Sequence, residues 1–171
     1  MAQAPANIIL IGMPGSGKSA IGLVLAQLTS MDFVDTDSLI RKSTGRSLQD
    51  IVDTDGATAF RKIEAEILLK LDCRNHVIAT GGSAVYSSAA MAHLKKDGIM
   101  VFLDVDLATL MSRVHDYATR GLAKHPEQTL QDLFDERLGL YRKYADVVVN
   151  CVGLTQDEIC AAILRGLKRD G

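Results

Sequence analysis

A short apolar run that leads into a glycine-rich loop is the feature of this sequence that most constrains its fold. Residues 8–11 read IILI and continue directly into GMPGSGKS at positions 12–19, which matches G-x-x-x-x-G-K-[ST] at every fixed position. Residues 20–28, AIGLVLAQL, then supply an apolar helical segment. In this strand, loop and helix context, backbone N–H groups and the helix N-terminus bind phosphate. The sequence therefore predicts a phosphate-binding loop near its amino terminus.

The loop also predicts which groups would contact such a ligand. Its glycines let the backbone turn tightly and direct successive N–H groups at phosphate oxygens. Lys18 can reach the terminal phosphates, and the hydroxyl of Ser19 is suited to hold Mg²⁺. An incidental glycine-rich turn is the alternative, but the flanking strand and helix argue against it. The expected nucleotide contacts are Gly15, Ser16, Gly17, Lys18, Ser19 and Ala20.

Length and composition restrict the number of domains in the chain and the class of partner that it can bind. The 171 residues match one domain, 1–171, with 47% apolar and 23% charged residues, as in ordinary globular chains. A net charge of −2 gives no general attraction to nucleic acid or membrane, and no apolar run is long enough to span a bilayer. The three cysteines, odd in number and without metal-ligand spacing, are expected to be reduced thiols. We expect a cytoplasmic monomer with a small-molecule partner.

Apolar strands alternate with helical stretches along the chain, which predicts a three-layer α/β/α fold with a five-stranded parallel sheet. Residues 116–128 fit neither pattern and are predicted to form a mobile lid, with a plain surface loop as the alternative. The expected strands are 8–11, 32–34, 76–79, 99–103 and 147–149. The expected helices are 18–28, 38–42, 57–71, 88–95, 107–115, 130–144 and 155–167.

Two acidic residues follow the second expected strand. Asp35 and Asp37 flank Thr36 at the carboxyl end of that strand, the edge where open α/β sheets bind ligands. In an extended segment both side chains would point the same way, one toward Mg²⁺ and one toward an acceptor hydroxyl. Capping of the following helix is an equally good explanation for an acidic residue at this position.

Glycines and arginines supply the remaining candidates. Gly81 and Gly82 follow the third expected strand, where a missing side chain lets a ligand approach the backbone and N–H groups can bind an oxyanion. An ordinary strand-to-helix turn is the alternative. Arg61, Arg120 and Arg137 would form a substrate clamp if they converged, because a guanidinium binds a carboxylate or phosphate through two hydrogen bonds.

The order of these parts resembles the shikimate kinase family, within the nucleoside-monophosphate-kinase-like branch of P-loop proteins. The resemblance runs from residue 8 to about residue 150. It includes the phosphate loop, DTD at 35–37, TGRSL at 44–48, FRKIE at 60–64, TGG at 80–82 and the arginines at 120 and 137. It implies the P-loop NTPase fold of the nucleoside-monophosphate-kinase type, with a lid.

The resemblance also implies residue roles in an ATP-dependent transfer to shikimate that yields shikimate 3-phosphate and ADP. Lys18 would neutralise the transferring phosphate, and Ser19 and Asp35 would hold Mg²⁺. Asp37 would contact the acceptor hydroxyl and could deprotonate it. Further roles would be carboxylate binding by Arg61 and Arg137, lining of the acceptor pocket by Gly81 and Gly82, contact of Arg113 with adenine, and contact of Arg120 with the phosphates.

Three positions depart from the usual family pattern. Ser83 stands where a third glycine is usual, Gly121 follows the lid arginine where the family has a proline, and Gly139 replaces another proline. All three lie near the expected acceptor site or lid. A kinase of another hydroxy-carboxylate, such as homoserine or a sugar acid, is therefore the first alternative. A non-catalytic ATP-binding regulatory module is the second, although such a module would have no need for the full set of charged residues.

Overall fold

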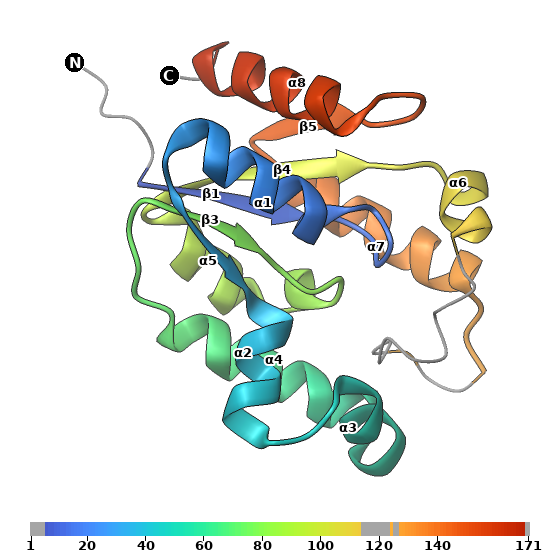
Figure 1. Cartoon of the computed structure of the whole chain (residues 1–171). Helices are drawn as coiled ribbons and strands as arrows, with labels where there is room; N and C mark the ends of the chain where they lie inside the picture. The colour runs from blue at the N-terminus through green and yellow to red at the C-terminus, as the bar shows by residue number, and fades with distance from the viewer. Residues whose placement is uncertain (1–5, 114–123, 125–126, 170–171) are drawn as a thin grey trace.

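A parallel sheet of five strands organises the molecule (Figure 1). The computed structural model describes residues 6–113, 124 and 127–169. The strand order is β2-β3-β1-β4-β5, and every neighbouring pair is parallel. The predicted five-stranded α/β fold is therefore confirmed, and each strand lies within one residue of its expected bounds. The strands are β1 (Asn7–Ile11), β2 (Asp32–Asp35), β3 (His76–Ala79), β4 (Gly98–Asp104) and β5 (Val147–Asn150).

Burial explains why these segments form strands. All five residues of β1 are buried, because this strand lies between β3 and β4 and is covered on both faces. Ile9 pairs with Ile78 on one side and with Met100 on the other, all at most 1% exposed. Strands covered on both faces need near-continuous apolar sequence. At the sheet edge, β5 instead alternates buried and exposed residues.

Helices cover both faces of the sheet. In Figure 1, α1 and α8 lie side by side in front of the strands, and α5 and α7 lie behind them. The main core fills the space between these layers and the sheet. The resulting three layers are those predicted. The helices in this part of the chain and in its extensions are α1 (Lys18–Thr29), α4 (Ala57–Lys70), α5 (Ser88–Lys95), α6 (Leu107–Ser112), α7 (Leu130–Tyr144) and α8 (Gln156–Arg169).

A smaller helical unit extends from the sheet beyond β2. It consists of α2 (Thr36–Thr44), α3 (Leu48–Asp55) and the start of α4, around a second apolar cluster formed by Ile40, Leu48, Ile51 and Phe60. Helix α3, which has only eight residues, was not predicted from the sequence. Such a short helix depends on its cap and on tertiary packing. Here Ser47 caps it by accepting a hydrogen bond from the Asp50 backbone N–H.

Two further segments differ from expectation. A 3₁₀ turn, η1 (Ala84–Tyr86), was not predicted, and α6 ends at Ser112 although helix was expected to residue 115. Residues 114–115 lie outside the described part of the chain, as does most of the expected lid, 116–128, including Arg120 and Gly121. Among the described residues, no helix is long and apolar enough to cross a membrane.

Candidate functional site

A cavity of about 600 Å³ opens at the carboxyl edge of the sheet. Five separate segments build its wall: the phosphate loop, α2 with the start of α3, α4, the turn after β3, and α7. The carboxyl edge of parallel strands is where α/β proteins bind ligands. The lining residues are Pro14, Gly15, Gly17, Lys18, Ser19, Ala20, Asp37, Arg41, Ser47, Leu48, Phe60, Glu64, Thr80, Gly81, Gly82, Ser83 and Arg137.

The phosphate loop has the backbone that an anion site requires. Gly15 and Gly17 adopt φ values of 83° and 95°, which residues with a side chain rarely adopt. Helix α1 begins at Lys18 with no side-chain cap and no acidic residue in its first turn. The first N–H groups of α1 and the positive end of its dipole therefore face the cavity, and no acidic side chain of the first turn pairs with them. This arrangement suits a phosphate group.

Lys18 lies folded into the loop. Its Nζ donates hydrogen bonds to the carbonyl oxygens of Gly12 at 2.6 Å and Met13 at 2.9 Å, and it lies 3.4 Å from Oγ of Ser16. Burial lowers the pKa of Lys18 to about 8, although the neighbouring Asp37 opposes this shift. An anion entering the loop would favour the charged ammonium. Contacts with the loop thus hold Lys18 at the wall of the cavity.

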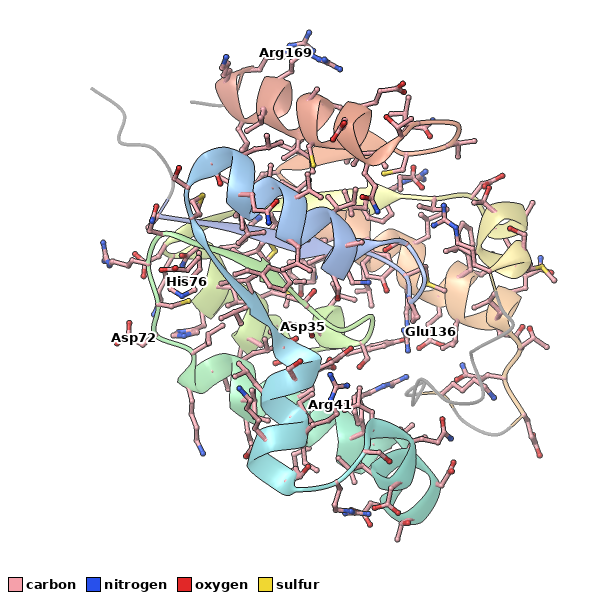
Figure 2. The ribbon with its side chains drawn as sticks, viewed as in Figure 1. Asp35, Arg41, Asp72, His76, Glu136 and Arg169 are labelled. Atoms are coloured by element: carbon pink, nitrogen blue, oxygen red, sulfur yellow. The ribbon has the colours of Figure 1, made fainter. Side chains whose placement is uncertain are left out.

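Ser19 and Asp35 form a pair of oxygen ligands beside the loop. The Ser19 hydroxyl donates to Oδ2 of Asp35 at 2.9 Å, and Figure 2 shows Asp35 where β2 runs into α2. Mg²⁺ prefers hard oxygen ligands, and it usually takes one or two from protein and the rest from phosphate and water. The hydroxyl and carboxylate present here fit that requirement. The two predicted metal ligands therefore lie together, next to the phosphate loop.

The Asp35-Thr36-Asp37 segment is not extended as predicted. Asp35 ends β2 and caps α2, and its Oδ1 accepts a hydrogen bond from the Asp37 backbone N–H at 2.9 Å. Asp37 thus lies in the first turn of α2 and lines the cavity from there. This contact confirms the capping explanation. A carboxylate beside the unpaired N–H groups of the first turn stabilises the start of a helix. Burial raises the pKa of Asp37, and the neighbouring Asp35 raises it further.

The turn after β3 brings backbone against the cavity. The Gly81 N–H donates to the Thr36 hydroxyl at 3.2 Å, so this amide serves the fold and is not directed at a ligand as the sequence suggested. A Cβ on Gly81 would collide with Oε2 of Glu64 and lie 2.9 Å from Oδ1 of Asp37. A Cβ on Gly82 would lie 2.7 Å from Cδ of Pro14 and 2.9 Å from Nη1 of Arg137. The turn favours glycine because the ring of Pro14 and charged side chains crowd it.

A buried carboxyl group lies behind that turn. Glu64 is 1% exposed, and its Oε1 accepts a hydrogen bond from the hydroxyl of Ser83, itself 5% exposed. Oε2 of Glu64 has no hydrogen-bond partner among the described residues. Burial raises the pKa of Glu64 to about 7, and the hydrogen bond from Ser83 opposes that shift. Ser83, the departure from the glycine usual in the family, thus has a defined partner.

The predicted arginines occupy different places around the cavity. Arg137 is 1% exposed and lines the main cavity. Arg61 lines a smaller neighbouring cavity of about 260 Å³, which shares Glu64 and Ser83 with the first. Nη1 of Arg113 donates to the Gly15 carbonyl oxygen at 2.8 Å, so this arginine lies beside the phosphate loop. The structure does not describe Arg120.

Sequence reasoning missed several residues of the cavity wall. Glu64 lies within a motif that had been recognised, and Arg41 enters from α2, where Figure 2 shows it below Asp35. Ser83, expected near the acceptor site or lid, does line the cavity. One signal could have identified Glu64. Phe60 and Glu64 are four residues apart, so they share a helix face, and a carboxylate on a buried apolar face indicates a polar site.

Comparison with known proteins places the chain in a family. A family model described as Shikimate kinase matches residues 14–168. The chain belongs to the shikimate kinase family. It is 36% identical over 166 residues to the shikimate kinase of Thermodesulfovibrio yellowstonii, with 95% of each chain covered. The chain is accordingly a small-molecule kinase, a phosphotransferase, as the motif order predicted.

Solved structures agree with this assignment. The shikimate kinase from Acinetobacter baumannii in complex with shikimate superposes with a TM-score of 0.89 at 31% identity, covering 98% of this chain and 95% of that one. A gluconokinase from Sinorhizobium meliloti superposes with a TM-score of 0.59 at 22% identity, covering 98% and 94%. The second likeness concerns the fold alone. The relation to shikimate kinases therefore carries more weight than the relation to a sugar-acid kinase.

Proposed function

We propose that this protein transfers the γ-phosphoryl group of ATP to a secondary hydroxyl of shikimate, giving shikimate 3-phosphate and ADP. The observation that carries the proposal is a single cavity whose wall includes Lys18 of the phosphate loop, the carboxylate of Asp37 and the guanidinium of Arg137. A phosphoryl donor, an acceptor hydroxyl and an acceptor carboxylate each have a matching group there. The family relation supports shikimate as the acceptor.

At the donor side, the phosphate loop would bind ATP through the backbone N–H groups of residues 15–20 and through Lys18. Ser19 and Asp35 would hold Mg²⁺, which neutralises phosphate charge when it is bound. Arg113, beside the loop, would lie against the adenine. By the family resemblance, Arg120 would contact the phosphates, and the lid at 116–128 would close over them to exclude water.

At the acceptor side, Asp37 would accept a hydrogen bond from the attacking hydroxyl and orient its oxygen toward the γ-phosphorus. Its raised pKa makes this carboxyl a better proton acceptor than an exposed aspartate. Arg137 and Arg61 would bind the substrate carboxylate. Gly81 and Gly82 would let the ring of the substrate approach the backbone. Phosphoryl transfer then depends mainly on positioning and charge neutralisation.

The remaining expectations accompany this proposal. We propose that the chain works as one domain, as a monomer in the cytoplasm, without nucleic-acid or membrane partners. The net charge of −2 supports the absence of polyanionic partners. A small, soluble hydroxy-carboxylate as substrate is compatible with a cytoplasmic location.

The test is ADP release with Mg²⁺-ATP and a panel of acceptors: shikimate, homoserine, gluconate, a nucleoside monophosphate and no acceptor. We expect turnover of about 1 to 1,000 per second on shikimate alone. Lys18→Met is the control, because it keeps the length of the side chain and removes the charge, and it should abolish turnover. Turnover on another acceptor with none on shikimate would contradict the proposal. ATP binding without turnover on any acceptor would indicate a regulatory module.

A further inference from the structure

One aromatic ring lies against both arginines that are expected to bind the acceptor carboxylate. Tyr86 ends the η1 turn, which follows the glycines after β3. The Cζ atom of Arg61, from α4, lies 3.7 Å from the centroid of its ring, and the Cζ atom of Arg137, from α7, lies 5.3 Å from it. Both distances fall within the range of about 6 Å over which a guanidinium is attracted to an aromatic face. Tyr86 therefore links two helices that are distant in sequence.

The hydroxyl of Tyr86 adds a directional contact. Nε of Arg137 donates a hydrogen bond to the Tyr86 oxygen at 3.2 Å, and the Tyr86 hydroxyl donates to Oε1 of Glu136 at 2.6 Å. Oε2 of Glu136 accepts a further hydrogen bond from Nε2 of Gln128 at 2.9 Å. Figure 2 shows Glu136 on α7, across the site from Asp35. This chain of contacts determines the orientation of the Tyr86 hydroxyl.

Protonation of the phenol is consistent with this network. Burial raises the pKa of Tyr86, and the hydrogen bond to Glu136 raises it further. The hydroxyl therefore keeps its proton near neutral pH and directs it at Glu136. Its oxygen lone pairs remain as acceptors for Arg137. A neutral phenol can thus serve a carboxylate and a guanidinium at the same time.

The contacts also constrain how Arg137 is presented. A guanidinium is planar and rigid, so a hydrogen bond at Nε determines the direction of the two terminal nitrogens. Nη1 of Arg137 reaches the cavity wall at Gly82, where it would lie 2.9 Å from an added Cβ. Binding a carboxylate through two parallel hydrogen bonds requires a fixed orientation of the guanidinium, because both donors must face both oxygens.

We propose that Tyr86 is a positioning residue for acceptor binding. It holds Arg61 by a cation–π contact, and Arg137 by a longer cation–π contact and a hydrogen bond, at the geometry that captures the substrate carboxylate. The proposal rests on the proposed function, since it assumes a carboxylate-bearing acceptor. Tyr86 itself need not contact the substrate. Loss of Tyr86 should weaken binding of the acceptor equally in the ground state and in the transition state. The acceptor KM should therefore rise while kcat stays unchanged.

Two substitutions separate the contributions of the ring and of the hydroxyl. Tyr86→Leu removes both, and we expect the KM for shikimate to rise about tenfold, with kcat and the KM for ATP within about twofold of the wild type. Tyr86→Phe keeps the ring and should raise that KM by only about twofold to fivefold. Tyr144→Leu is the matched control. Tyr144 also has a cation near its ring, Lys143 Nζ at 5.2 Å from the centroid, but it lines neither cavity.

An acceptor without the carboxylate distinguishes positioning from a general structural role. The methyl ester of shikimate keeps the ring and the hydroxyls, and the wild type should use it with a much lower kcat/KM. If Tyr86 acts through the carboxylate, Tyr86→Leu should lower kcat/KM for shikimate about tenfold and for the ester by less than about twofold. An equal loss of kcat/KM on both acceptors would overturn the positioning role of Tyr86 but leave the proposed function standing. Failure of the wild type to phosphorylate shikimate would overturn the proposed function and the clamp with it.

Discussion

Replacing Glu64 by glutamine tests how a buried carboxyl beside the acceptor cavity couples folding to pH. Glu64 is 1% exposed, and burial raises its pKa from 4.5 to about 7. Glutamine has nearly the same shape, and its amide oxygen can accept the hydrogen bond from Ser83. It cannot ionise. The substitution therefore removes the titration while it keeps the packing.

The size and the sign of the effect follow from the two pKa values. Between pH 4.5 and about 7, the unfolded chain has released the proton of Glu64 and the folded chain keeps it. The contribution of Glu64 to stability is therefore complete below pH 4.5 and is lost as the pH rises through 7. One pKa unit corresponds to about 1.4 kcal/mol, so the wild type should lose about 3 kcal/mol of unfolding free energy across this window through Glu64.

Urea unfolding at pH 5, 6, 7 and 8 measures this quantity. The unfolding free energy of Glu64→Gln, relative to the wild type, should increase by about 3 kcal/mol from pH 5 to pH 8. Glu66→Gln is the matched control, because Glu66 lies on the same helix and is exposed. It should follow the wild type at every pH. A difference between Glu64→Gln and the wild type that stays constant with pH would refute the reasoning.

Three glycine and serine substitutions give further tests around the same cavity. Ser83→Gly removes the hydrogen bond that opposes the shift of Glu64, so the pH at which stability is lost, measured by the same urea series, should move upward. Gly81→Ala inserts a Cβ against Glu64 and Asp37. It should lower the unfolding free energy by about 1 to 3 kcal/mol and raise the acceptor KM in the ADP-release assay. Unchanged values of both quantities would contradict the crowding of this turn. Gly139 lies in α7 and is exposed, and a Cβ added there would meet nothing within 4 Å. Gly139→Ala should therefore raise the unfolding free energy by about 0.5 to 1 kcal/mol and leave kcat unchanged, and a loss of stability would show that a glycine is required there.

Most of the fold was predictable from local sequence. The five strands and the long helices carry their own periodicity, and the phosphate loop carries its glycines, lysine and serine in one continuous run. Short or strongly packed segments were harder to predict. Helix α3 depends on the Ser47 cap and on the cluster around Ile40 and Phe60, and neither is visible in an eight-residue window. Asp37 was expected in an extended segment, but capping by Asp35 starts the helix at Thr36, two residues earlier than expected.

The sequence by itself determined the phosphate loop of this protein, because the backbone groups and side chains of that loop, residues 12–20, are contiguous in the chain. The acceptor side was decided by tertiary structure. Glu64 meets Ser83, and Tyr86 meets Arg61 and Arg137, only after α4, the turn after β3 and α7 pack together. Burial then changes the chemistry of these groups, raising the pKa of Glu64 to about 7. Neither a pairwise distance nor the loss of solvent around a charge is encoded in any one segment, so both appear only in the folded chain.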